Sequence, residues 1–434
     1  MDILAQAKLL GMLVIGLIVG LAVGYGAFAA TAPKPGEVVT PPPKIPSEIP
    51  VGVLITMTGE LSDLGPLYRA GALIAQDDVN AYLKNSGLNY TVKVYLEDTA
   101  TTSDGALAAT QALAAKGIKV IISYLSMDIR ATQSFVNDHK IVEISYASTA
   151  PELAIAGDYI FRLVPNDLHQ GKGIARIMWD AGVRNAAVAY RGDAWGDGLF
   201  AAFKARFAEL GGKVDSVRFD PSAKDLSAEA LSLADIVKGF GVSNSTGVLH
   251  LTFDEDGIAL LTAIKDNPAL TGVRWFGSDG DVGSPRVRDV YGELIQKLWT
   301  PCTIYTVPTA PNQAEFNNRW RTATGETMPG SYEWALYDGL FLATLATLQA
   351  GVYDGEAIKN VFAQAAFHYF GLTGWTILDD AGDRAYAPYE IQAIMPTAGL
   401  PGVTPQTRPL DWVIVGYYSE ETDSVTWVPP HIPA

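Results

Sequence analysis

The sequence predicts an α/β fold built from two doubly wound lobes. Three apolar runs, Val120–Ile122, Ile141–Ile144 and Val273–Phe276, each end at small polar or acidic residues before a helix-like stretch. Strands of a parallel sheet that is covered on both faces read as short, continuous apolar runs. Ligands of such sheets bind just beyond the carboxyl ends of the strands. The polar groups after these runs therefore favour a binding site for a small polar molecule over a catalytic site.

Strand-like and helix-like segments alternate from residue 51 onward. Residues 90–96 alternate between apolar and polar side chains, as a strand does, and the Ala-rich stretch 104–116 ends at Gly117, a typical helix stop. The alternation of strands and helices predicts right-handed, doubly wound topology. The expected strands of the first lobe lie at 51–55, 90–96, 120–122 and 142–144, and its expected helices at 68–83, 104–116 and 129–139.

The same pattern restarts after Asp167 and predicts a second lobe. Its expected strands lie at 186–190, 214–219, 247–252 and around Trp275, and its expected helices at 171–180, from 197 onward, at 226–237 and at 256–267. The last part of the chain reads as two helices, at 335–349 and 355–365, followed by β-rich segments from 372 to 427. No period of about 20–50 residues recurs, which excludes a solenoid.

Composition excludes several classes of function. The net charge of −16 over 434 residues argues against nucleic acid as a partner, because phosphate binding needs clustered Lys and Arg. The only cysteine, Cys302, excludes an intrachain disulfide, a Cys-based metal site and a lipid-anchored N-terminus. The five histidines lack HxxxH or HxH spacing, so no metal and no other cofactor is expected. GxSxG, HExxH and P-loop motifs are absent, and no catalytic residue is expected.

The N-terminus carries an apolar run long enough to cross a bilayer. Leu9–Ala30 holds 22 uncharged residues behind Lys8, and a hydrocarbon core of about 30 Å needs roughly 20. The Ala27–Ala29 pattern also allows a cleaved secretory signal, although the run exceeds the usual apolar region of a signal. We expect residues 1–31 to be a transmembrane anchor or signal segment and residues 32–50 a Pro-rich stalk. The protein is then extracytoplasmic, either tethered to the outer face of the cytoplasmic membrane or secreted after cleavage.

A series of short motifs extends along the globular part, from about residue 49 to residue 427. In chain order they are Val53–Gly59, Ile144–Leu153, Ala194–Gly198, Asp225–Ala228, Trp275–Gly280, Tyr332 with Tyr337–Asp338, Gly371–Gly374, and Gly416–Tyr418 before Trp427. Their order resembles the type I periplasmic-binding fold, specifically the branched-chain amino-acid-binding (Leu/Ile/Val-binding) family of ABC-transporter substrate-binding proteins.

The resemblance implies two lobes joined by three hinge crossovers, near residues 162–167, 298–303 and 369–376. Lobe 1 would comprise 50–165 plus 301–370, lobe 2 would comprise 166–300 plus 371–427, and 428–434 would be a tail. Such a protein captures an amino acid or related small amine between its lobes by hinge closure and delivers it to ABC permease subunits. A sensory or regulatory receptor of the same fold, without transport, is the alternative.

The resemblance also implies the ligand-binding residues. Ser126, Ala147 and Thr149 would hold the carboxylate and ammonium of an amino acid from lobe 1, and Asp279 would pair with the ammonium from lobe 2. Trp195 would cover the ligand, and either Thr252 or Phe253 would occupy a position where a Tyr is common. Each residue also has a structural interpretation: Ser126 and Thr149 as helix caps, Asp279 as a turn residue and Trp195 as part of the core.

Overall fold

The computed structural model describes residues 44–307, 309–386, 388–398 and 408–429. The predicted anchor or signal segment 1–31, stalk residues 32–43 and tail residues 430–434 lie outside the described residues. Within the described ranges, no helix is both long and apolar enough to cross a membrane.

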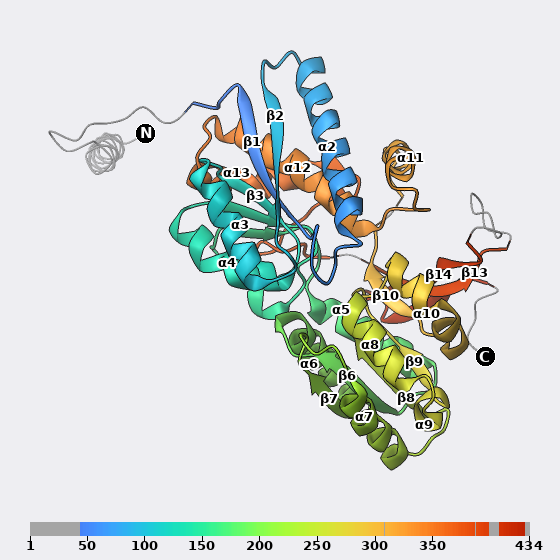
Figure 1. The fold of residues 1–434 in the computed structure, drawn as a ribbon. Helices are drawn as coiled ribbons and strands as arrows, with labels where there is room; N and C mark the ends of the chain where they lie inside the picture. The colour runs from blue at the N-terminus through green and yellow to red at the C-terminus, as the bar shows by residue number, and fades with distance from the viewer. Residues whose placement is uncertain (1–43, 308, 387, 399–407, 430–434) are drawn as a thin grey trace, which may run out of the picture. The chain divides into compact units, whose positions relative to one another are not determined.

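The first half of the chain forms a five-stranded parallel sheet in the order β2-β1-β3-β4-β5. Helices α2 and α12 pack together on one face, with α13 beside α12, while α3 and α4 pack against the other (Figure 1). The strands are β1 (Glu48–Ile55), β2 (Thr91–Asp98), β3 (Val120–Ser123), β4 (Val142–Ser145) and β5 (Ile160–Arg162). The helices are α2 (Gly65–Asn85), α3 (Ser103–Ala115), α4 (Ser126–Asp138), the short 3-10 helix η1 (Pro151–Leu153), α12 (Ser331–Ala350) and α13 (Gly355–Phe367).

Two apolar faces explain the continuous hydrophobic runs of these strands. In β1, Val51 and Val53 belong to the core beneath α2 and α12, whereas Leu54 belongs to the core beneath α3 and α4. Both kinds of position are shielded from water, so successive residues are apolar. Helix α12 is buried on nearly every side, which accounts for the apolar residues found all around it.

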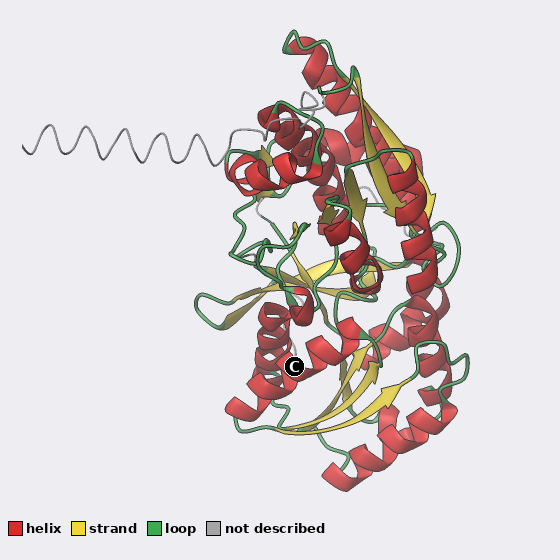
Figure 2. Ribbon diagram, turned by 90° about the vertical axis from the view of Figure 1, so that its left-hand side faces the viewer, coloured by secondary structure: helices red, strands yellow, loops and turns green. Residues whose placement is uncertain are grey.

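A second parallel sheet has the order β7-β6-β8-β9. Helices α5 and α6 pack together against one face, and α7 and α8 cover the other (Figures 1 and 2). The strands are β6 (Asn185–Arg191), β7 (Lys213–Phe219), β8 (Thr246–Leu251) and β9 (Arg274–Phe276). The helices are α5 (Asp167–Asp180), α6 (Ala194–Glu209), α7 (Ser227–Phe240), α8 (Asp254–Ile264), α9 (Pro268–Thr271) and α10 (Pro285–Leu298).

The remaining strands form an antiparallel sheet and a hairpin. The sheet has the order β10-β13-β14-β15, and α10 packs against β13 and β14. The strands of this sheet are β10 (Cys302–Tyr305), β13 (Tyr389–Pro396), β14 (Leu410–Ser419) and β15 (Ser424–Trp427). The hairpin pairs β11 (Phe370–Gly371) with β12 (Gly374–Trp375). Helix α11 (Gln313–Thr324) packs on α2.

The chain passes between the two parallel sheets in three places: after β5, between α10 and α11, and between α13 and β13. A buried ion pair joins the first and third passages, because the Arg162 guanidinium donates to the carboxylate of Asp383. Strand β10, which begins at residue 302, pairs with β13 of the antiparallel sheet. The lobe boundaries given above stay a prediction. Strand β10 lies directly after residue 300, where the predicted assignment changes from lobe 2 to lobe 1.

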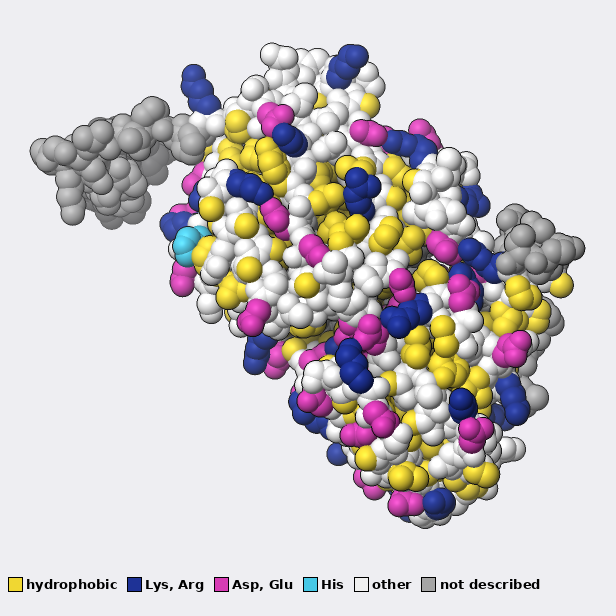
Figure 3. Space-filling view, viewed as in Figure 1, with side chains coloured by type: hydrophobic (Ala, Val, Ile, Leu, Met, Phe, Trp, Pro, Cys, Tyr) yellow, Lys and Arg dark blue, Asp and Glu magenta, His cyan; other side chains and the backbone are white. Residues whose placement is uncertain are grey.

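The order in which strands are added reverses once in each parallel sheet. The reversal lies between β1 and β3 in the first sheet and between β6 and β8 in the second. Crevices that bind ligands form beyond the carboxyl ends of strands at such points. The outer surface has a different character. On the face in Figure 3, Lys and Arg side chains are scattered among Asp and Glu and form no stripe.

Candidate ligand-binding site

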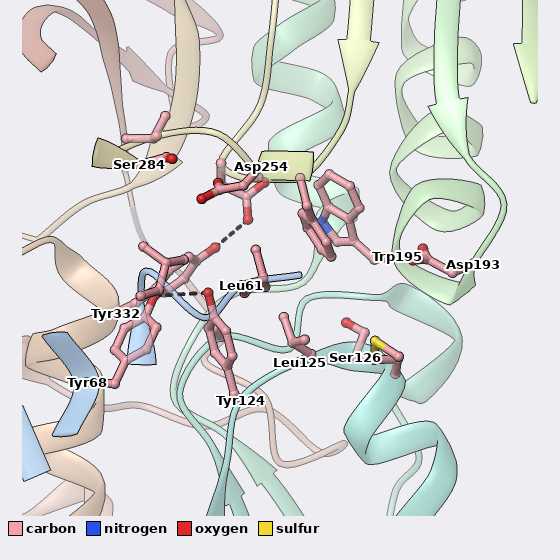
Figure 4. A pocket seen from close by; sticks show the side chains of 17 residues that line it. Leu61, Tyr68, Tyr124, Leu125, Ser126, Asp193, Trp195, Asp254, Ser284 and Tyr332 are labelled. Atoms are coloured by element: carbon pink, nitrogen blue, oxygen red, sulfur yellow. Dashed lines mark hydrogen bonds between the residues drawn. The ribbon is translucent and has the colours of Figure 1, made fainter. Parts of the chain in front are cut away.

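A cavity lies where the carboxyl ends of both parallel sheets face each other. Its walls come from the segments that follow β1, β3 and β4 in one sheet and β6, β8 and β9 in the other, together with α2 and α12 (Figure 4). Its volume is about 40 Å³, enough for roughly three water molecules. Residues that follow strands of both sheets therefore line one small cavity.

Ser126 and Ala147, two of the residues predicted to bind the ligand, lie in the cavity wall. Ser126 begins α4, so its hydroxyl sits at the positive end of a 13-residue helix. The hydroxyl accepts the backbone N–H groups of Thr149 and Ala150, both at 3.2 Å. This links the ends of β3 and β4. Backbone N–H groups in the first turn of a helix lack helical partners and are suited to an anion.

Thr149 is buried and does not line the cavity. Its hydroxyl donates to Oδ2 of Asp167 at 2.9 Å, and the Asp167 N–H donates back to the Thr149 carbonyl at 2.8 Å. In this structure Thr149 therefore connects β4 to the start of α5 and is turned away from the space where a ligand would lie.

Trp195 and Phe253 form one aromatic wall of the cavity. Their rings stack with centroids 4.6 Å apart, and both are at least nine-tenths buried. Between the two alternatives at the end of β8, Phe253 lines the cavity. Thr252 instead donates to Asp281 at 2.8 Å and lies 2.9 Å from Nδ1 of His250, within a buried network.

Asp279 lies in the wall that follows β9, and both of its oxygens have partners. Gln170 of α5 donates to Oδ1 at 2.9 Å, and the hydroxyl of Tyr332 on α12 donates to Oδ2. Burial raises the pKa of Asp279 above its ordinary value, although these two hydrogen bonds lower it. The Tyr332 contact crosses from α12, beside the first sheet, to the end of a strand in the second.

Gly280 explains how the Asp279 loop comes so close to the neighbouring strand. A Cβ atom at this position would lie 2.1 Å from the carbonyl oxygen of Thr252 and 2.9 Å from the rings of Phe253 and Trp195. Only glycine permits this approach, which holds Asp279 against the aromatic wall.

A tyrosine cluster forms the opposite wall. Tyr68 and Tyr124 line the cavity, their rings lie 4.7 Å apart, and the Tyr68 hydroxyl donates to that of Tyr124 at 3.0 Å. Tyr146 stacks on Tyr124 at 5.1 Å. Burial raises the pKa of Tyr68 and of Tyr146 well above 10, so these hydroxyls stay protonated.

Two acidic residues of the wall, Asp193 and Asp254, were not predicted from the sequence. Asp193 caps α6 by accepting the Gly196 N–H and pairs with Arg191 at 2.7 Å. Asp254 directly follows the Phe253 N-cap of α8. Its position after a strand end is the same signal that pointed to Asp279, and it would have found Asp254 as well. Two tyrosines of the wall, Tyr68 and Tyr332, lie on helices and carry no such signal.

The lining residues include three carboxylates and no Lys, Arg or His. In the part of the chain that the structure describes, no group of three or more His, Cys, Asp or Glu side chains could hold a metal ion. The arrangement offers hydroxyls and a helix N-terminus on one side, acids on the other and aromatic faces between them. Such an arrangement is chemically suited to a small, polar, cationic or zwitterionic molecule.

Comparison with known families decides the classification. The family model described as periplasmic binding protein matches residues 48–394, more than half of the chain. The chain belongs to the periplasmic binding protein family. The predicted resemblance to the type I fold and to the branched-chain amino-acid-binding family is thereby confirmed, and the family comprises solute-binding receptors rather than enzymes.

Two curated relatives of this periplasmic binding protein span most of its length. An uncharacterized protein of Methanocaldococcus jannaschii is 29% identical over 399 residues, which cover 87% of this chain and 91% of the relative. The leucine-, isoleucine-, valine-, threonine- and alanine-binding protein of Pseudomonas aeruginosa is 27% identical over 342 residues, covering 75% of this chain and 84% of the relative.

Solved structures show the same fold. A leucine-binding protein from Thermotoga maritima superimposes with a TM-score of 0.71 at 20% identity, covering 86% of this chain and 99% of the other. A solute-binding protein of an ABC transporter from R. palustris, in complex with 4-hydroxybenzoate, gives 0.70 at 16% identity, covering 87% and 98%. The fold therefore accommodates ligands of different chemistry.

Proposed function

We propose that this periplasmic binding protein is the extracytoplasmic receptor of an ABC importer and captures an amino acid or a related small amine between its two lobes. The observation that carries the proposal is the polarity of the cavity, with a helix N-terminus and hydroxyls on the lobe 1 side and carboxylates on the lobe 2 side. The binding of amino acids by the P. aeruginosa relative supports the same ligand class.

The zwitterion of an amino acid matches this polarity. Its carboxylate would lie at the N-terminus of α4 near Ser126 and Ala147, where the helix dipole favours negative charge. Its ammonium would lie toward Asp279. Because burial raises the pKa of this carboxyl group, a cationic partner would favour its charged form. Trp195 and Phe253 would then exclude water from the side chain of the ligand.

Hinge closure couples recognition to a change of conformation. In this structure the Tyr332 hydroxyl of lobe 1 reaches the Asp279 carboxylate of lobe 2. A ligand held by Ser126 and Ala147 would bring its ammonium to the same carboxylate. A ligand that contacts both lobes stabilises the closed state because only that state lets it make both sets of contacts.

The N-terminal run Leu9–Ala30 completes the proposal. We propose that it is a retained membrane anchor, which would hold the receptor beside the permease subunits of its importer at the outer face of the cytoplasmic membrane. The Pro-rich residues 32–47 would then act as a semi-extended spacer. The predicted stalk 32–50 is too long by three residues, because residues 48–50 belong to β1.

Calorimetric titration of the purified receptor with the common amino acids and with short uncharged amides tests the function. We expect at least one amino acid to bind with micromolar or lower Kd. Asp279→Asn should weaken that binding by about 2–5 kcal/mol, because it removes one member of a buried charge pair. Asp225→Asn is the matched control, since Asp225 is exposed and lies outside the cavity. Binding of sugars or neutral molecules alone would refute the proposal.

A further inference from the structure

Three acidic residues occupy the first turn of α8: Asp254, Glu255 and Asp256. Two of them have cationic partners. Glu255 pairs with Lys224 at 2.6 Å, and Asp256 pairs with Arg191 at 2.5 Å and accepts the Phe253 N–H. Asp254 forms no ion pair within the described ranges. The helix N-terminus carries about half a positive charge and compensates the charge of this third carboxylate only in part.

Asp254 is fully buried, yet neither of its carboxylate oxygens has a hydrogen-bond partner of acceptable geometry among the described residues. The Ser284 hydroxyl lies beside it and lowers its pKa in part. The charged groups that act on it most strongly are Asp281, Asp63 and Glu60, all of them acidic. A buried carboxylate without a cationic or fully donating partner is costly, so a structural role alone does not explain this residue.

The side chain of Asp254 faces the cavity. It belongs to the cavity wall together with Ser284 and Trp195, and Figure 4 shows it between these two residues. The other two acids of the wall differ from it. Asp193 is paired with Arg191, and Asp279 accepts from Gln170 and Tyr332. Asp254 is thus the lining carboxylate with the fewest partners, since only the Ser284 hydroxyl lies beside it.

We infer that Asp254 seats a second cationic group, so that the preferred ligand carries a positively charged side chain in addition to its α-ammonium. This inference rests on the proposed function and narrows it from amino acids in general to basic amino acids. The α-ammonium lies toward Asp279, the side-chain ammonium pairs with Asp254 beside Ser284, and the faces of Trp195 and Phe253 border the cation.

The test compares ligands that have the same shape and differ only in charge. Ornithine and norleucine form one such pair, and 2,4-diaminobutyrate and norvaline form a second, shorter pair. We expect the full-length receptor to bind the cationic member of at least one pair ten or more times more tightly than its neutral isostere, measured by calorimetry at pH 7.

Three variants test whether Asp254 causes the preference for the cationic ligand over its neutral isostere. Asp254→Asn should reduce the preference at least tenfold, whereas Asp254→Glu, which keeps the charge, should retain the preference for the cation. Glu255→Gln is the matched control because it removes the neighbouring negative charge outside the cavity wall, and it should leave the ratio unchanged. Circular dichroism verifies that each variant is folded.

The possible results separate the two proposals. If norleucine or norvaline binds the unmodified receptor as tightly as its cationic partner, the assignment of Asp254 is wrong and the amino-acid receptor stands. An Asp254→Asn variant with an unchanged preference would contradict the assignment equally. If neither cationic nor neutral amino acids bind, both proposals fail.

Discussion

At the residue scale, burial raises the pKa of Asp254 from 3.8 to about 8, and the neighbouring acids Asp281, Asp63 and Glu60 add to the effect. A carboxyl group whose pKa is higher in the folded state than in the unfolded state binds its proton more tightly when folded. Its contribution to stability is therefore most favourable below the pKa of the unfolded state and declines as pH rises toward 8. At neutral pH, the ligand-free protein would be more stable with a neutral residue in place of Asp254.

We expect Asp254→Asn to stabilise the ligand-free protein by an amount that grows with pH. The gain in the free energy of unfolding should be small near pH 5 and reach several kcal/mol at pH 8, with a slope of at most about 1.4 kcal/mol per pH unit. Urea denaturation of both proteins from pH 5 to pH 8.5 measures it. Asp128 and Glu143, whose pKa values burial raises to about 7, are common to both proteins and cancel in the difference. A constant difference across this range would show that Asp254 ionises normally.

Much of the candidate site could be predicted from sequence because it lies at strand ends. Ser126, Ala147, Trp195, Phe253 and Asp279 all follow strands, and the structure brings them to one cavity. Thr149 follows a strand too, but its hydroxyl is used by Asp167. That pairing depends on the packing of α5 and could not be read from local sequence. The same holds for Tyr68 and Tyr332, whose helices reach the cavity only through tertiary packing.

At the scale of elements, Arg191 joins three segments at the end of β6. Its Nη1 donates to Asp256 of α8 at 2.5 Å and to Glu60 of the β1–α2 loop at 2.8 Å, and its Nε donates to Asp193 at 2.7 Å. The guanidinium also lies 4.0 Å from the centre of the Phe253 ring. The network therefore connects the aromatic wall of the cavity to both sheets.

Arg191→Met should lower the free energy of unfolding by about 3–5 kcal/mol, because it leaves the buried carboxylate of Asp256 without its cation. The matched control is Arg218→Met, which removes an ion pair with Asp197 whose side chains are 52% and 45% exposed and should cost less than about 1 kcal/mol. Chemical denaturation measures both. Equal, small losses would mean that the buried network adds nothing to stability. Adding Asp256→Asn to Arg191→Met should restore part of the loss.

Most elements of the fold could also be predicted, because both parallel sheets are covered on two faces and their strands read as apolar runs. The strand β5 was missed because it has only three residues, Ile160–Arg162. The helix α10 was missed although it has 14 residues and its apolar positions recur at helical spacing. No element was predicted between the strand around Trp275 and the crossover expected near residue 298. The pairing of β10 with β13 joins segments far apart in sequence, and local patterns carry no information about it.

At the scale of the whole molecule, the N-terminal run predicts where the receptor resides. If Leu9–Ala30 is retained as an anchor, the native protein should remain with membranes after alkaline washing, and mass spectrometry should find its N-terminal peptides. A deletion of residues 1–31 is the control and should release the protein. A mature chain that begins at Ala30 would establish a cleaved signal instead.

On ligand binding, we expect the two lobes to close on each other. The lone cysteine, Cys302, is buried, so spin labels can be attached selectively at Lys84→Cys on α2 and Lys238→Cys on α7, both of them exposed positions. Neither position lines the cavity. The labels therefore report the separation of the lobes without disturbing the site.

Pulsed electron–electron double resonance then measures the distance between the two labels, without ligand and with a saturating concentration of the amino acid that binds most tightly. We expect a broad distribution of distances in the free protein and a narrower distribution, centred on a different distance, once the ligand is bound. Single-label proteins control for local changes at each site. Identical distributions with and without ligand would rule out hinge closure, because the receptor would then hold its ligand without a change in the separation of the lobes.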